Sequence, residues 1–456
     1  MLLIKSRIAK LLLICLLIIP ATLYYFYKSD VGSGIRGLHS PADCPGCNVV
    51  VIMIDTLRAD HLPMYGYSRN TSPFLKTLFE KSTVFTRAYA PSAWTAPSVA
   101  SVFTSVMPST HGVITGFAAT RNQKKRGLAI ELNIIPENFQ TLGEYMREAG
   151  YRTIGVADNL NIGKEMGFSR GFDYFKKYTY KGAPVINDTA RQFLQNAGDD
   201  KPYFLYLHYM DPHAPYYKRR PWFQECFEES NKSGKDNTIC AYNSEIAYVD
   251  SYIAELFEEY DWLNNSIVFV MSDHGEEFWD HGGTGHGKTL YNEMIHVPFA
   301  MYHPKRKPQT YTSNVHIFDL LPTLAGLLNT NHVNAWQGHN LYKYIQEDYA
   351  DDMRVLLSER LRTPTSRRNW WKRAVIRGDW HFIRKENEQG ILQDMLFNFI
   401  DDYKQLNNLV AQNMNIVKEL ESELREINLP NALGNSMSVE LDEELFQQLR
   451  TLGYIN

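Results

Sequence analysis

The sequence has little net charge, little cysteine and few long apolar runs, and each shortage excludes a class of protein. Its 456 residues carry 47 Lys and Arg against 51 Asp and Glu, a formal charge of −4. This balance lacks the basic excess of a dedicated nucleic-acid binder. With 44% hydrophobic residues the chain is too apolar for wholesale disorder and too polar for a polytopic membrane protein. A globular chain of this length buries a large core, so its five cysteines need not form a disulfide framework.

One long apolar run is present, at the N-terminus. Lys5, Arg7 and Lys10 precede an uncharged stretch at 11–27, which would span about 26 Å as a helix, against about 30 Å of hydrocarbon core. The run ends in aromatic residues and Lys28 rather than in the small-residue site of a cleaved signal peptide, which remains the alternative. We predict a signal anchor over 8–28, with a cytoplasmic N-terminus and the rest of the chain periplasmic or extracellular.

A Gly, Ser and Pro-rich linker at 29–47 would follow the anchor. In an oxidising compartment two local disulfides are expected, one between Cys44 and Cys47 and one between Cys226 and Cys240. The first pair could also be half of a zinc site, although no second pair has suitable spacing.

Alternating apolar runs and helical patterns predict the fold class. The run at 48–54 has the continuous hydrophobicity of a strand buried on both faces of a parallel sheet, and 151–156, 203–207 and 266–271 are similar. Helical patterns at 139–149, 188–196 and 244–259 separate these runs. The alternation predicts a doubly wound α/β sheet with helices on both faces.

Several side chains that can bind metal follow three of these predicted strands: Asp55; His208, Asp211 and His213; Asp273 and His274. Ligand sites in open α/β sheets lie at the carboxyl ends of the strands, so one crevice would collect all six. Carboxylates mixed with imidazoles suit a divalent ion such as Zn²⁺ or Mn²⁺. For any single Asp, the alternative is an ordinary turn former or helix cap.

A nucleophile is expected at Thr95, in the segment 92–104. The pattern places Thr95 at a helix N-cap with Pro97 in the first turn. Backbone N–H groups and the helix dipole there favour an anionic phosphoryl or sulfuryl group. Coordination to a divalent cation would activate the hydroxyl for attack. An ordinary capping role is the alternative.

Six ordered motifs, at 55–67, 94–98, 108–112, 208–216, 272–277 and 285–291, resemble the sulfatase family of the alkaline phosphatase superfamily. Segments 373–380 and 441–454 resemble the closing elements of bacterial sulfatase-like proteins. The resemblance implies a mixed sheet in a catalytic domain at 48–345 and a smaller α+β C-terminal subdomain at 346–456.

The resemblance also implies roles for individual residues. Thr95 would be the nucleophile and a metal ligand, and Lys288 would neutralise the substrate anion. His213 and His286 would contact the transferred group, protonate the leaving oxygen, or join Asp211 around a second metal. His208 and Arg58 lie in the same motifs and are candidate substrate contacts. The implied metal ligands are Asp55, Thr95, Asp273 and His274, with Asp211 at a second metal.

The departures from the family are informative. Formylglycine-dependent sulfatases carry a converted Cys or Ser where Thr95 stands and an Arg where Val99 stands, so we expect no formylglycine. The expected cofactor is a divalent metal: Zn, Mn, Ca or Mg. Thr95 has one hydroxyl, so a second nucleophile must resolve its covalent adduct. In this the chain resembles superfamily members with a Thr nucleophile, the nucleotide phosphodiesterases and the phosphoethanolamine and phosphoglycerol transferases.

The sequence therefore predicts a metal-dependent hydrolase of a sulfate ester or a phosphoester, with the phosphoester favoured on mechanism. A membrane-anchored transferase and a non-catalytic glycan- or lipid-binding descendant are the alternatives. The expected partners are an anionic ester, in a glycan, lipid headgroup or small molecule, and the membrane through the anchor, with no nucleic acid. The oligomeric state stays open.

Two features near the C-terminus complete the expectations. A basic and aromatic run from Arg360 to Arg373 would bind an acidic glycan or lipid headgroup, or form a solvated loop. The helical pattern at 413–427, with Val417, Leu420 and Leu424 on one face, predicts a packing helix.

Overall fold

The computed structural model describes residues 44–117, 131–196, 201–330, 332–347, 350–361, 370–390, 392–426 and 436–438. All of these belong to the larger of two compact units, 39–456. Within these ranges no helix combines the length and the hydrophobicity that crossing a membrane requires. The predicted anchor at 8–28, most of the linker and the motif at 441–454 lie outside the described residues.

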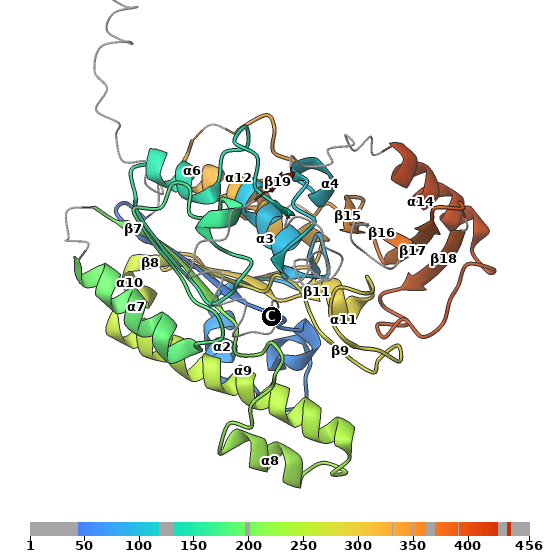
Figure 1. The fold of residues 1–456 in the computed structure, drawn as a ribbon, viewed down its shortest axis with the longest axis horizontal. Coiled ribbons are helices and arrows are strands. Elements are labelled where there is room, and N and C mark those ends of the chain that lie inside the picture. Colours follow the sequence, from blue (N-terminus) through green and yellow to red (C-terminus); the bar gives the residue numbers. More distant parts are fainter. Residues whose placement is uncertain are drawn as a thin grey trace, which may run out of the picture. The chain divides into compact units, whose positions relative to one another are not determined.

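The core of the fold is an eight-stranded mixed sheet (Figure 1). Its order is β13 (Gln309–Tyr311), β2 (Thr83–Phe85), β12 (Phe299–Tyr302), β8 (Ser266–Met271), β1 (Asn48–Ile54), β7 (Tyr203–Tyr209), β5 (Arg152–Ala157) and β6 (Tyr174–Lys177). Only β12 runs antiparallel to its neighbours among these strands. The four strands predicted from apolar runs are confirmed.

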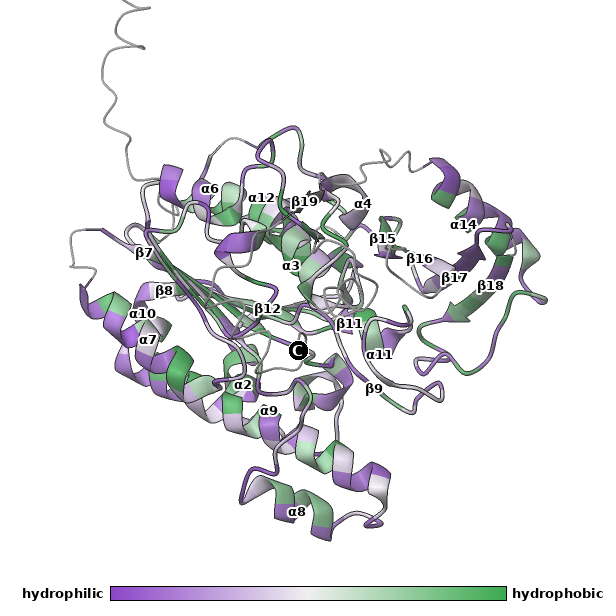
Figure 2. Cartoon of the chain, viewed as in Figure 1, coloured by the Kyte–Doolittle hydropathy of each residue, from purple (hydrophilic) through white to green (hydrophobic). Residues whose placement is uncertain are grey.

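Helices cover both faces of the sheet. Along β1, Val49, Val51 and Met53 enter one hydrophobic cluster, and Val50, Ile52 and Ile54 enter the other. The first face carries α3 (Thr95–Thr104), α6 (Leu142–Glu148) and α12 (Leu320–Leu327), and the second carries α2 (Pro73–Phe79), α7 (Ala183–Asn196), α9 (Gly234–Glu259) and α10 (Trp262–Asn265) (Figure 1). Hydrophobic residues accordingly follow the central strands (Figure 2). The doubly wound prediction is confirmed, in its mixed form.

The three predicted helices exist, but their first residues differ from the sequence patterns. Capping boxes at Thr141 and Ser233 start α6 and α9, and the latter places the start of α9 ten residues before the predicted 244. The start of α7 is set by a contact from elsewhere in the chain, because the N–H of Ala183 donates to Asp211.

A second sheet forms the C-terminal part of the described chain. The antiparallel strands β15 (Val355–Arg360), β16 (Trp370–Arg377), β17 (Trp380–Asn387) and β18 (Leu392–Asn398) carry α14 (Met414–Glu426). The buried face of α14 consists of Val417, Leu420 and Leu424, which confirms the predicted packing helix. The domain boundary at 345 stays a prediction.

Short elements connect these layers. They are η1 (Ala59–His61), η2 (Pro63–Tyr65), β3 (Ala88–Tyr89), α4 (Pro108–His111), β4 (Glu131–Asn133), η3 (Lys164–Met166), α8 (Trp222–Glu228), β9 (Glu277–Phe278), β10 (Thr284–Gly285), α11 (Asn292–Ile295), β11 (His296–Val297), β14 (Val315–His316), η4 (Ile317–Asp319), α13 (Leu341–Glu347) and β19 (Ser436–Ser438). Disulfides join Cys44 to Cys47 and Cys226 to Cys240, which confirms both predicted pairs and leaves no thiolate at Cys44 or Cys47 for zinc.

Candidate active site

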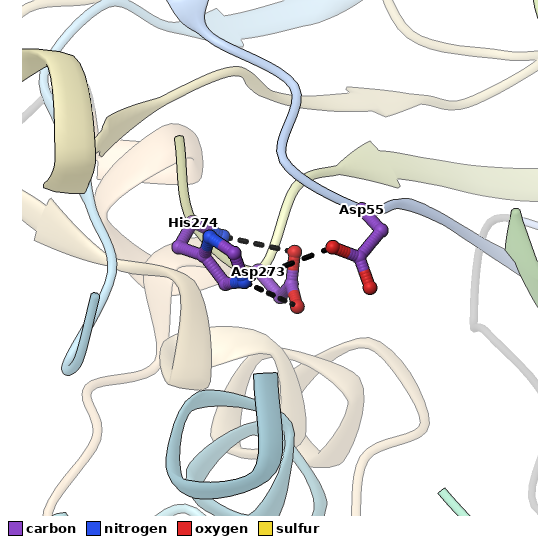
Figure 3. A group of neighbouring side chains, drawn as sticks. All are labelled: Asp55, Asp273 and His274. Carbon is purple, nitrogen blue, oxygen red and sulfur yellow. Dashed lines mark hydrogen bonds and ion pairs between the residues drawn. The ribbon is translucent and has the colours of Figure 1, made fainter. Parts of the chain in front are cut away.

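Three buried side chains meet at the carboxyl ends of two neighbouring parallel strands. Asp55 follows β1, and Asp273 and His274 follow β8. Because Met53 pairs with Met271, the residues beyond both strands emerge at one edge of the sheet. One ligand atom from each residue lies within 4.8 Å of the others, and the side chains point toward one another (Figure 3). We call these three residues the metal group.

The metal group has the unmet bonding capacity that a cation would satisfy. Asp55 Oδ1 and Asp273 Oδ2 are buried and accept no hydrogen bond from any described residue. His274 Nε2 lies 3.7 Å from the first oxygen and 3.4 Å from the second. Buried carboxylate oxygens without partners are costly, so these residues fit a divalent ion.

The electrostatics of the group lead to the same conclusion. Burial and the nearby charge of Asp55 raise the pKa of Asp273. Burial also acts to raise the pKa of Asp55, but a hydrogen bond from His208 and the charges of neighbouring histidines lower it overall. Burial and the charge of His286 lower the pKa of His274 to about 3, so its imidazole is neutral and able to ligate.

The second oxygen of Asp55 is held from three directions. His208 Nε2 lies at 3.1 Å, Asn159 Nδ2 donates at 2.7 Å and Thr95 Oγ1 lies at 3.4 Å. The other ring nitrogen of His208 lies 2.9 Å from the hydroxyl of Tyr206. His208 is fully buried and both of its nitrogens are engaged, so it orients Asp55. Its expected contact with a substrate stays a prediction.

Thr95 stands beside the metal group at the start of α3. Its Oγ1 lies 3.2 Å from His274 Nε2. The N-cap is Trp94, so the predicted capping position of Thr95 is wrong by one residue and its hydroxyl is available to the metal group. Gly287 N donates to Ala93 O at 2.8 Å, which brings the loop containing His286 to the start of this helix. The predicted nucleophile and metal ligands thus lie together.

Two histidines face each other next to this cluster. The ring centroids of His213 and His286 are 4.9 Å apart, and those of His286 and His274 are 4.7 Å apart. Burial acts to lower the pKa of His286, but the carboxylate of Glu276, with Oε1 3.2 Å from His286 Nδ1, raises it overall. Burial and the charge of His286 lower the pKa of His213. The pKa values of the two facing imidazoles are therefore shifted in opposite directions.

Two further expected site residues make structural contacts. All five N–H groups of Arg58 donate to oxygens of Asp60, Asp280 and Glu276. The expected contact of Arg58 with a substrate stays a prediction. Asp211 is not part of the metal group: its Oδ1 accepts from Ala183 N at 3.2 Å and holds the first turn of α7, while its Oδ2 is buried without a hydrogen-bond partner among the described residues. The second metal expected at Asp211 stays a prediction.

Lys288 lies on the loop beside His286, and its ammonium donates to Thr284 O. From the C-terminal sheet, Arg360 Nε donates to Gly287 O and Lys372 Nζ to Lys288 O. This part of the expected basic run therefore supports the loop that carries His286. Arg362, Arg367 and Arg368 lie outside the described residues.

Sequence reasoning missed Asn159 and Glu276. Asn159 follows β5 as Asp55 follows β1, so its position after a strand was a usable signal, but an amide does not stand out as a metal-site residue. Glu276 lies two residues after His274, and its carboxylate also accepts from the hydroxyl of Tyr216 at 2.8 Å.

Comparisons with known proteins agree with this geometry. The family model named Sulfatase matches residues 47–330, more than half of the chain. The Δ4,5-hexuronate-2-O-sulfatase of Bacteroides thetaiotaomicron is 23% identical over 336 residues, covering 61% of this chain and 68% of that enzyme. The Kdo(2)-lipid A phosphoethanolamine 7''-transferase of Salmonella typhimurium is 25% identical over 245 residues, covering 52% of this chain and 40% of the transferase.

Solved structures show the same fold. The yidJ protein of Bacteroides fragilis superposes with a TM-score of 0.72 at 19% identity, covering 87% of this chain and 99% of that one. The phosphonate monoester hydrolase of Agrobacterium radiobacter gives a TM-score of 0.64 at 15% identity, covering 87% of this chain and 98% of that one.

Proposed function

Because this chain belongs to the sulfatase family of ester hydrolases, we propose that it cleaves a phosphoester or a sulfate ester through a covalent intermediate on Thr95. The observation that carries the proposal is the position of Thr95 Oγ1, 3.2 Å from His274 Nε2 and next to two carboxylates with unpartnered oxygens. Thr95 takes the position that formylglycine occupies in other members, and a divalent metal is the cofactor.

Thr95 and His286 carry the two halves of the reaction. A divalent cation held by the metal group would lower the pKa of the Thr95 hydroxyl, which would lose its proton to solvent before the attack. The Thr95 oxygen attacks phosphorus or sulfur in line, the bond to the leaving oxygen breaks, and His286 gives that oxygen its proton. Water then attacks the Thr95 ester, His286 takes the proton of the water, and the Thr95 oxygen leaves.

His213 serves the second half of this reaction. Its Nδ1 lies 2.6 Å from Ala214 O, a contact that places the ring proton on Nδ1 and leaves Nε2 as a hydrogen-bond acceptor. The lowered pKa of His213, from burial and the charge of His286, keeps the ring neutral. A neutral acceptor beside His286, which has by then given up its proton, can orient the attacking water.

The single hydroxyl of Thr95 favours a phosphoester over a sulfate ester. A formylglycine hydrate expels sulfate through its second hydroxyl, a route that threonine lacks. Water must instead attack the adduct, as in phosphodiester hydrolysis. Transfer to an acceptor hydroxyl is the second candidate, and the similarity to a phosphoethanolamine transferase supports it. A purely binding role is less consistent with a complete metal group beside Thr95.

The experiment compares bis-p-nitrophenyl phosphate, p-nitrophenyl phosphate and p-nitrophenyl sulfate on the full chain, with metal content measured in parallel. We expect the diester to be cleaved fastest. Thr95→Ala should abolish turnover while most of the metal stays bound, and Thr77→Ala, an exposed helical threonine, should change neither. Wild-type rates in Thr95→Ala, or no cleavage of any of the three esters by the metal-loaded chain, would contradict the proposal.

We also propose that the chain is a single-pass membrane protein whose catalytic domain lies outside the cytoplasm. The basic residues before the apolar run 11–27 support this orientation. Two disulfides are consistent with an oxidising compartment.

A further inference from the structure

A cavity of about 750 Å³ lies beside the active site and takes no part in the proposed reaction. Its lining comes from six segments: the turns after β1, the residue after β2, the start of α9, β9 with the loop that follows it, β11, and the loop after β18. Among the described residues, no member of the metal group lines it, nor do Thr95, His213 or His286. Its size is that of a pocket for a ligand of one to a few rings.

The polar floor of this cavity offers hydrogen-bond acceptors rather than donors. Asp60 and Asp280 flank the buried Arg58, and their side chains are 27% and 29% exposed. Since every N–H of Arg58 is already used, the guanidinium has none for a ligand. The carboxylate oxygens keep spare lone pairs, so the floor suits groups that donate.

The two carboxylates remain ionised. Burial acts to raise their pKa values, but the charge of Arg58 lowers the pKa of both Asp60 and Asp280 overall. An anionic group would therefore be repelled at the floor, whereas hydroxyl groups can donate to it.

Aromatic rings form much of the wall. Phe278, Tyr67 and Tyr65 come from the catalytic domain, and Phe399 and Tyr403 come from the loop after β18. The ring of Tyr67 stacks on His61 with centroids 4.8 Å apart. Rings beside acceptor groups match a ligand with an apolar face and a hydroxyl-bearing edge.

Two exposed lysines complete the lining. Lys235 lies in the first turns of α9 and Lys404 in the loop after β18. Their positive charges oppose the acidic floor and favour a negative substituent at that side of the ligand.

From these features we propose that the cavity is a glycan-binding site, separate from the metal group, that holds a pyranose ring with its hydroxyls on Asp60 and Asp280 and its apolar face on the aromatic wall. Glu276 links the site to the reaction centre. Its backbone oxygen accepts from Arg58 Nη1 at 2.9 Å, and its carboxylate contacts His286. The proposal does not depend on the chemistry of Thr95.

Calorimetric titration of the full chain tests the site, in a detergent whose headgroup is not a sugar. The probes are cellohexaose, which is neutral, and two acidic oligosaccharides, hexagalacturonate and a chondroitin 4-sulfate hexasaccharide. We expect at least one probe to bind, and to bind equally to Thr95→Ala, which separates this site from turnover. No binding of any probe would overturn the proposal.

Two variants locate the binding. Ile239→Trp enlarges a half-buried side chain of α9 that lines the cavity, and it should weaken binding at least 10-fold. Lys235→Ala with Lys404→Ala should weaken the acidic probes and not cellohexaose, and Lys343→Ala, an exposed lysine of α13 away from the cavity, should weaken none. Melting temperature and metal content check folding, and the lysine variants serve if Ile239→Trp does not fold. Affinity unchanged by both cavity variants would overturn the proposal.

Discussion

At the scale of single residues, the proposed reaction divides between Thr95, which attacks, and His286, which carries a proton. Glu276 raises the pKa of His286 against the effect of burial, which suits a ring that must hold its proton until the leaving oxygen needs it. His213, with a lowered pKa, lacks that proton. The two rings therefore have unequal roles despite facing each other.

Loss of His286 should matter most for poor leaving groups. In His286→Asn we expect kcat to fall about 10²–10⁴-fold for an alkyl phosphodiester, which needs its leaving oxygen protonated, and far less for a nitrophenyl ester. Steady-state rates on a matched pair of esters measure this difference. His332→Asn, at an exposed histidine, is the control. Equal losses on both esters would show that His286 is not the proton donor.

The melting temperature should depend on the metal, because the carboxylates of Asp55 and Asp273 each have a buried oxygen without a partner among the described residues. We expect added Mn²⁺ or Zn²⁺ to raise the melting temperature of the metal-free full chain, since the ion binds the folded state. In Asp273→Asn, one of the three ligands is lost and this rise should disappear, while Asp188→Asn on the exposed face of α7 should retain it. A rise of wild-type size in Asp273→Asn would place the ion elsewhere.

At the scale of elements, the contacts between layers decide where the site loops lie. Asp319, which ends η4 and precedes α12, forms two charged hydrogen bonds with Arg354, directly before β15, at 2.6 and 2.8 Å. Both side chains are buried. The C-terminal sheet is thus fixed to α12, and its Arg360 and Lys372 in turn hold the loop of His286.

Breaking this pair should destabilise the chain. Asp319→Asn leaves the charge of Arg354 buried without a counter-ion, and we expect a loss of about 3–5 kcal/mol in the free energy of unfolding at pH 7. The pair at Asp188 and Arg191 is exposed, so Asp188→Asn should cost under about 1 kcal/mol. Urea unfolding measures both variants, and similar losses would contradict the role of burial.

The same pair predicts how stability depends on pH. Burial acts to raise the pKa of Asp319, but Arg354 lowers it below the unfolded value of 3.8. The folded state therefore binds fewer protons than the unfolded state near that pH, and the contribution of the pair is present above pH 4 and lost as the pH falls below it. The decline in stability over that range should be shallower in Asp319→Asn than in the wild type.

Element prediction from sequence succeeded where the signal was local. Apolar runs located β1, β5, β7 and β8, and the rule that sites follow strands brought Asp55, Asp273 and His274 together. The sequence did not show that Arg58 pairs with Asp280, because Asp280 lies 222 residues away. It did not show the contact of Asp211 with the N–H of Ala183 either, since these two residues are also distant in sequence.

At the scale of the whole molecule, the proposed anchor and the catalytic domain should be separable. We expect the full chain to sediment with membranes and to resist carbonate extraction, and a chain starting at residue 29 to be soluble. Protease added to intact cells or spheroplasts should cleave the full chain's catalytic domain. A full chain that stays soluble, or that is protected from external protease, would contradict the predicted topology.

The whole-molecule prediction from sequence was sound for the fold and incomplete for the chemistry. Six motifs identified the family, but no local pattern distinguishes a sulfate ester from a phosphoester, since both are tetrahedral anions bound by the same kinds of groups. The phosphoester is preferred because Thr95 has a single hydroxyl. Its covalent adduct cannot expel the bound group by itself, so a second in-line displacement, by water, must follow the first.

The stereochemical course of phosphodiester cleavage tests that requirement most directly. A phosphorothioate diester of known configuration would be hydrolysed by the full chain in ¹⁸O-labelled water and the product configuration determined by ³¹P NMR. Attack by Thr95 followed by attack by water inverts phosphorus twice, so we predict net retention. Net inversion would mean that water attacks the substrate directly, and Thr95 would not be the nucleophile.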